Sequence, residues 1–262
     1  IMAIYTLDGY IAAGKQQVQL SKTASMTTVA ANWSSPFALA GNPGAGTLAG
    51  TSTTTGVVPT DATAGCPIIN FSTGTVYLTA VDFGSTVASR MMVSDLMWKG
   101  GAYAFNANTS GNTPTSYSSR ITDSDYTGCG IWLEQVTAGT GVQNVNVTYI
   151  NQAGTPGRTT GTIATAANIV GRMWRLPLQA GDTGVQGITG VVGSTATAGT
   201  FNILVLRTLW HGRVRAANDG DVHALDKTGM PLVYPDSALV LAVCADGTAS
   251  GIPELMLEVA NG

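Results

Sequence analysis

Residues 91–100 read Met91-Met92-Val93-Ser94-Asp95-Leu96-Met97-Trp98-Lys99-Gly100, and residues 203–212 read Ile203-Leu204-Val205-Leu206-Arg207-Thr208-Leu209-Trp210-His211-Gly212. Each stretch begins with an apolar trio and ends with Trp-x-Gly, and the trio lies at the same distance before the tryptophan. Each also follows a Gly-Ser-Thr triplet, at Gly84-Ser85-Thr86 and at Gly193-Ser194-Thr195. This ordered match indicates that one unit occurs twice in the chain.

The match continues in the same order further along the chain. Ile131-Trp132-Leu133 corresponds to Leu241-Ala242-Val243, and residues 141–151 correspond to residues 251–261. Pro43-Gly44 and Pro156-Gly157 agree more loosely at the start of each unit. Several matches in one order predict a tandem duplication in the regions around 43–151 and 156–261. The alternative is two unrelated segments that share a Gly- and Thr-rich composition.

The apolar pattern predicts that both units are built from strands. Val145, Val147 and Tyr149 alternate with polar residues, as do Leu255, Leu257 and Val259, and a period of two is typical of half-buried strands. Further strands are predicted from their β-forming residues at 77–81, 201–206 and 238–245. Gly-rich turns are predicted at 138–141 and 246–248. The sequence therefore predicts an all-β fold of two tandem β-sandwich or jelly-roll-like domains, at 41–152 and 153–262.

The first 40 residues do not belong to either unit. Leu7 and Ile11 are spaced for one face of a short helix, with Ile4 in phase and Thr6 as its cap. We predict that residues 1–40 form an N-terminal arm, part helix and part extended. The arm could dock on a partner or pack against its own first domain. The first residues have no basic region and no long apolar run, so no secretion signal is expected.

The composition restricts the class of protein. Charged residues make up 10% of the chain, against roughly a quarter in ordinary soluble domains, and small polar or apolar residues replace them. The net charge of -3 argues against nucleic acid as a partner. The apolar runs are too short to predict a membrane span. Cys66, Cys129 and Cys244 are far apart and are predicted to be buried free thiols, which favours synthesis in a reducing cytoplasm.

The sequence offers little for enzymatic chemistry. There are two histidines, His211 and His223, and the first repeat has Lys99 where the second has His211. That position therefore does not require an imidazole. Motifs for a nucleophile elbow, a phosphate-binding loop or a zinc protease are missing from the sequence. We predict that the protein is not an enzyme, and that it has no catalytic residues and no cofactor.

One polar stretch contains residue types that can bind a metal ion. Asn218-Asp219-Gly220-Asp221-Val222-His223, with Asp226 beyond, could supply oxygen ligands to a hard cation. It departs from the EF-hand pattern, and the matching residues 106–112 contain no acidic residue. We predict a solvated turn here and another at Asp123-Ser124-Asp125, and no metal site.

A basic cluster supplies the candidate interface residues, which are Arg207, Trp210, His211, Arg213 and Arg215. Arginine and tryptophan are favoured anchors of protein interfaces, so an arginine-mediated contact with a partner subunit is predicted. An arginine beside an aromatic ring can also stack on nucleic acid or carbohydrate, and a solvated strand face is the plainer alternative. Trp98 and Trp210 themselves are predicted to pack in the core or against a sheet.

The low charge, the Thr- and Gly-rich repeats and the arm together resemble virion structural proteins of tailed bacteriophages. The resemblance is general across the chain and involves no specific motif. Within that family, head decoration (cement) proteins are the best match, being small sandwiches or jelly rolls bound on a capsid lattice. The resemblance implies major capsid or other virion proteins as partners, a homo-oligomer, and a location in the virion after assembly in the host cytoplasm. Many modest contacts repeated by symmetry would then supply retention.

Three other functions remain open at this point. A tail or head–tail structural component would also be a β-rich former of symmetric rings. A carbohydrate-binding adhesin would present a row of exposed tryptophan or tyrosine side chains. A hydrolase with its site between the two domains would depend on His211, His223 or Asp221.

Overall fold

The structure is a computed structural model that describes residues 4, 6–71, 74–110, 114–165, 169–193 and 198–262. It is nearly all β, with one central sheet, two outer sheets and a short ribbon of β2 (Ser21–Lys22) and β4 (Gly41–Asn42). The predicted all-β, sandwich-like fold class is confirmed. None of the described helices is long and apolar enough to cross a membrane.

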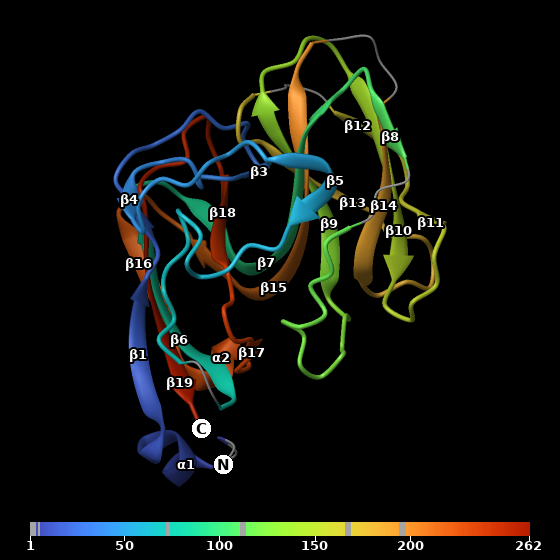
Figure 1. Ribbon diagram of the computed structural model, residues 1–262. Coiled ribbons are helices and arrows are strands. Elements are labelled where there is room, and N and C mark those ends of the chain that lie inside the picture. The colour runs from blue at the N-terminus through green and yellow to red at the C-terminus, as the bar shows by residue number, and fades with distance from the viewer. Residues whose placement is uncertain (1–3, 5, 72–73, 111–113, 166–168, 194–197) are drawn as a thin grey trace.

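The central sheet has the strand order β13-β9-β15-β7-β18-β3, and β5 also pairs with β7. The strands β7 and β15 are the longest, with 16 and 15 residues, and they run side by side through the middle of the molecule (Figure 1). The bounds of the seven strands are β3 (Trp33–Ser34), β5 (Ser52–Val57), β7 (Ser89–Ala104), β9 (Cys129–Thr137), β13 (Met173–Leu176), β15 (Thr200–Val214) and β18 (Leu239–Ala245).

Each outer sheet packs on one end of the central sheet. One has the order β1-β19-β6-β16, with β17 also on β6, and the other has the order β11-β10-β14-β8, with β12 also on β10. We call the two halves the β19 lobe and the β10 lobe. Each lobe encloses its own apolar core. The bounds are β1 (Gly14–Gln19), β6 (Val76–Ser85), β8 (Asn108–Ser110), β10 (Gln143–Asn151), β11 (Arg158–Thr159), β12 (Ile163–Thr165), β14 (Val185–Gly193), β16 (Asp219–His223), β17 (Leu232–Val233) and β19 (Pro253–Asn261), with helices α1 (Leu7–Ala12) and α2 (Leu225–Thr228).

The register of β7 against β15 supports the duplication. Trp98 lies opposite Val205, and Trp210 lies opposite Val93. Trp98 matches Trp210 and Val205 matches Val93 in the two repeats, so the two pairs are equivalent. The flanking strands obey the same rule, because their pairings are Leu133 with Ile203 and Val243 with Met91. A local two-fold axis between β7 and β15 therefore relates the two repeats, and we call residues related by it counterparts.

The two repeats exchange strands. In the β19 lobe, β6 and β7 of the first repeat pair with β19 and β18 of the second. In the β10 lobe, β14 and β15 of the second repeat pair with β10 and β9 of the first. The predicted segments 41–152 and 153–262 therefore do not form separate sheets. The long strands β7 and β15 extend through both lobes. Each repeat therefore has the strand before its long strand in one lobe and the strand after it in the other lobe.

One match between the repeats is shifted by a residue. Val145 pairs with Gly193, while its counterpart Leu255 pairs with Phe83. Gly193 is thus the counterpart of Phe83, and the sequence match to Gly84 was wrong by one position. The remaining residues of that triplet, Ser194 and Thr195, lie outside the described residues.

The N-terminal segment packs against its own chain. The predicted helix forms as α1, and the Thr6 hydroxyl accepts a hydrogen bond from the Gly9 amide at 3.0 Å. Its apolar face does not pack as the spacing suggests, since Leu7 and Ile11 are exposed while Ile4 is buried. Beyond the helix, β1 pairs with β19 and β3 pairs with β18. The described residues of this segment therefore add β1 and β3 to the second-repeat strands β19 and β18, and do not dock on the first domain alone.

A third apolar cluster covers the outer face of the central sheet, where Phe37 and Cys66 pack on Met92 and Leu204. The three cysteines are free and buried, as predicted. Burial raises the pKa of the Cys66 and Cys129 thiols to about 12, so both remain protonated at neutral pH.

Candidate functional site

Three of the five candidate interface residues lie together. His211, Arg213 and Arg215 are exposed and line an open cleft of about 510 Å³ beside β15. Sequence reasoning missed two further lining residues, Trp33 from β3 and Arg90 from β7. These come from distant parts of the chain, and only the pairing of β3, β18, β7 and β15 brings them to this site.

The other two candidates lie elsewhere. Trp210 is 3% exposed and packs on Phe83 with the ring centroids 4.7 Å apart, which confirms its predicted core position. Arg207 donates to the Leu232 carbonyl at 2.9 Å and lies over the Tyr234 ring. A β-bulge between Thr208 and Trp210 shifts the alternation of side chains between the two faces of the sheet. The predicted grouping of all three arginines around Trp210 is therefore wrong.

The rim of the cleft carries an unbalanced positive charge. Arg90 and Arg213 lie directly opposite each other on β7 and β15, and like charges in that arrangement repel. Asp246 approaches Arg213 at 3.9 Å, and both of these side chains are about half exposed. Within the described part of the chain, the side chains of Arg90 and Arg215 form no ion pair and no hydrogen bond. The rim is therefore complementary to an acidic partner.

The histidine beside these arginines is held neutral. The His211 ring lies 6.3 Å from the Trp33 ring. Partial burial lowers the pKa of His211, and the charge of Arg175 lowers it further. His211 therefore adds an uncharged polar surface at neutral pH, and the positive charge of the cleft comes from the arginines.

The opposite wall of the cleft is β16, which carries Asp221 and His223. The sequence predicted a turn here, but the segment forms a strand that pairs with β6. The predicted turn at Asp123 is confirmed, because its carboxylate accepts the Asp125 amide. Asp221 accepts the Val222 amide at 2.8 Å, and this hydrogen bond is the main cause of its lowered pKa. The residues that the structure describes contain no group of three or more His, Cys, Asp or Glu placed to hold a metal ion.

His223 is hydrogen-bonded at one ring nitrogen and has a carboxylate near the other. Its Nδ1 accepts a hydrogen bond from the Trp210 indole at 2.9 Å, and its Nε2 lies 3.6 Å from Asp221. A general base needs one nitrogen free toward the substrate while the other is oriented by an acceptor. The geometry around His223 favours a positioning contact between β15 and β16.

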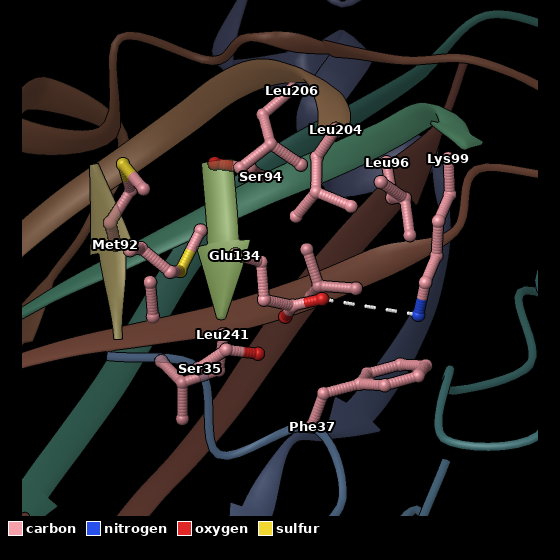
Figure 2. A pocket seen from close by; sticks show the side chains of 13 residues that line it. Ser35, Phe37, Met92, Ser94, Leu96, Lys99, Glu134, Leu204, Leu206 and Leu241 are labelled. Atoms are coloured by element: carbon pink, nitrogen blue, oxygen red, sulfur yellow. Dashed lines mark ion pairs between the residues drawn. The ribbon is translucent and has the colours of Figure 1, made fainter. Parts of the chain in front are cut away.

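The counterpart of His211 is in a closed environment. Lys99 is buried, and its Nζ donates to the Thr47 carbonyl at 2.9 Å and lies 4.0 Å from Glu134 (Figure 2). Asn202, the counterpart of Arg90, donates to the same carboxylate at 2.7 Å. Burial lowers the pKa of Lys99. The same position of the repeat is thus a buried lysine beside Glu134 in the β10 lobe, and a histidine that lines an open basic cleft in the β19 lobe.

Comparison with known proteins shows no family. No protein-family model and no curated protein matches the chain. Among solved structures, the chain has weak similarity to particles of infectious bursal disease virus. The Gx strain structure is 10% identical, with 95% of this chain and 80% of that chain covered and a TM-score of 0.18. The T=1 particle has 10% identity, 95% and 77% coverage and a TM-score of 0.18. The VP2 subviral particle has 9% identity, 95% and 80% coverage and a TM-score of 0.16. TM-scores this low do not indicate a shared fold.

Proposed function

We propose that this chain is a non-catalytic structural protein of a tailed-bacteriophage virion, and that it decorates the head lattice. The observation that carries the proposal is that several of its few charged residues pair with one another inside the body of the protein. Three carboxylate–cation pairs tie segments of the body together, and they are Asp95–Arg120, Lys99–Glu134 and Arg158–Asp182. These six charged residues thus help to fix the scaffold.

The pair of Asp95 and Arg120 is fully enclosed. Asp95 accepts hydrogen bonds from Arg120, from the Ser237 hydroxyl at 2.6 Å and from the Ala238 amide at 3.0 Å. Arg120 also donates to the Leu96 carbonyl at 3.0 Å. A buried pair is tolerated when most of its remaining hydrogen-bonding groups are satisfied, and of the groups in this pair Arg120 Nε is left without a partner. The result is a rigid link between β7 and two loops of the body.

The exchange of strands between repeats suits a load-bearing role. Separating the two lobes would require breaking β7 and β15 or stripping their neighbours from them. A lattice protein has to transmit force between subunits without opening, and its contacts gain strength from repetition by symmetry. The low overall charge, 10% of residues, agrees with extensive contacts of small side chains.

The adhesin alternative is disfavoured by the described residues, where Trp33 lines the cleft but is half-buried. The large apolar side chains that are exposed there include no tryptophan and no tyrosine. A stacking platform for sugars requires such rings to be accessible. The hydrolase alternative is disfavoured because Nδ1 of His223 accepts a hydrogen bond from the Trp210 indole and is not oriented by an acceptor.

Cryo-electron microscopy of purified particles tests the proposal. The protein is expected on the outer surface of the head at a copy number fixed by the lattice symmetry, and heads stripped of it should open at a lower temperature. Density in the tail would replace the decoration role with that of a tail component. Absence from purified particles, together with a monomeric state and no binding to heads, would sink the proposal.

A further inference from the structure

We propose that the free edge of β15, from Leu209 to Val214, binds an extended acidic segment of another protein as an added strand. The inference deepens the proposed function, because it names how a partner is held. It follows from comparing this edge with its counterpart on β7, where the chain itself supplies the added strand.

The counterpart edge is already occupied. On β7, Lys99 pairs with Val57 and Gly101 pairs with Ser52, so β5 lies along this edge. The counterparts of Lys99 and Gly101 on β15 are His211 and Arg213. The neighbouring strand β9 pairs with β15 only as far as Arg207. Beyond that point, no strand in the described ranges pairs with this side of β15.

The space next to the free edge is also the counterpart of the space that β5 fills. Beside β7, the Thr55 carbonyl of β5 accepts the Trp98 indole hydrogen at 3.1 Å. Beside β15, the counterpart indole of Trp210 is satisfied by His223 instead. The buried donor is thus paired without an added strand, and a cleft of about 510 Å³ remains.

An unpaired strand edge presents backbone donors and acceptors, and such edges recruit extended peptides. Charged side chains on an edge commonly prevent pairing with identical chains. Arg213 and Arg215 would do so here, because two copies of this edge would bring their arginines together. The same charges attract a strand of opposite sign, so they select the partner as well as excluding the wrong one.

The spacing of the arginines defines the ligand. Side chains two residues apart lie on the same face of an extended chain. Arg213 lies in β15, Arg215 follows directly after its end, and both are exposed. Arg90 lies directly opposite Arg213. A matching segment would be extended and would carry acidic residues at alternate positions.

Two labelled peptides are suitable probes at low salt. The first alternates valine with glutamate and has threonine at both ends, and the second has lysine in place of each glutamate. Fluorescence anisotropy should show at least about tenfold tighter binding of the glutamate peptide. Charge reversal by Arg213→Glu should weaken that binding by about tenfold or more. Lys15→Glu, which reverses an exposed charge on β1, is the matched control and should leave it unchanged.

Hydrogen exchange separates strand addition from simple charge attraction. Binding should protect amides within residues 209–214. The inference is wrong if the glutamate peptide binds without this protection, if the lysine peptide binds equally well, or if neither binds. If Arg213→Glu lowers the melting temperature, Arg215→Glu replaces it in the same assay. Failure here, with the protein still found on heads, would remove only the strand-addition mode and leave the proposed function.

Discussion

The Trp-x-Gly motif that marks both repeats has a direct steric cause. A Cβ atom added at Gly100 would lie 2.2 Å from the Trp98 ring, and one added at Gly212 would lie 2.2 Å from the Trp210 ring. Residues two apart share a face of a strand, so each indole lies across the backbone of the glycine that follows it. The motif occurs twice because the same buried packing occurs twice.

Gly212→Ala is therefore expected to destabilise the protein by roughly 1–3 kcal/mol, as overpacking of a core does. Urea unfolding followed by tryptophan fluorescence measures the change. Gly247→Ala is the control, because nothing lies within 4 Å of a Cβ added there. Equal stability of the two variants would show that the indole does not rest on Gly212.

Asp182 makes the stability of the β10 lobe depend on pH. It accepts hydrogen bonds from Arg158, Tyr149 and Asn151, and the bonds from Arg158 are the main reason that its pKa falls from 3.8 to about 2. A depressed carboxylate pKa stabilises the fold above the unfolded value and loses that effect as pH falls toward the folded value. The contribution should therefore be complete above about pH 4 and decline toward pH 2.

Thermal melts of the wild type and Asp182→Asn test this dependence. The variant should melt at a lower temperature at pH 6, and the difference should shrink at pH 2.5. A difference that stays constant across this range would mean that the carboxylate charge of Asp182 does not contribute.

At the level of elements, the alternation of apolar residues predicted β10 and β19 well, since each buries one face. It could not predict β16, because Asp219, Gly220 and Asp221 are poor strand formers and exposed. This segment is a strand because β6 offers it an edge. The cleft was only partly predictable for the same reason, since Trp33 and Arg90 reach it through pairing that no local pattern encodes.

The N-terminal segment provides a prediction for a single element. Leu20 is 1% exposed and packs in the core of the β19 lobe, so Leu20→Ala should destabilise the whole protein by about 2–5 kcal/mol. Leu7→Ala is the matched control, because Leu7 is 68% exposed, and surface changes of this kind stay within about 0.5 kcal/mol. Chemical denaturation of both variants measures the difference. A protein that tolerates both changes equally would have residues 1–40 acting as a detachable arm.

For the whole molecule, the order of the matched segments and the phase of their apolar residues predicted the repeats. They did not predict how the strands of the two repeats pair. Strands that pair within a repeat and strands that pair between repeats carry the same apolar pattern. The choice is made by β7 and β15, which are long enough to serve both lobes. Each lobe consequently needs strands from both repeats.

A divided chain tests this arrangement. Separation after Gly154, in the exposed turn that follows β10, gives fragments 1–154 and 155–262. Neither fragment should fold alone, because the first would contain β6 without β19 and β10 without β14. Mixing the two should restore the β-type circular dichroism and a cooperative transition.

The control is a full-length chain with a protease site at the same turn, cut after folding, which should remain one compact particle. The fragments should also bind each other in a one-to-one ratio, since each supplies the strands that the other lacks. If fragment 1–154 alone unfolded cooperatively and gave a dispersed amide spectrum, the repeats would be independent domains. Strand exchange would then not be what holds the two lobes together.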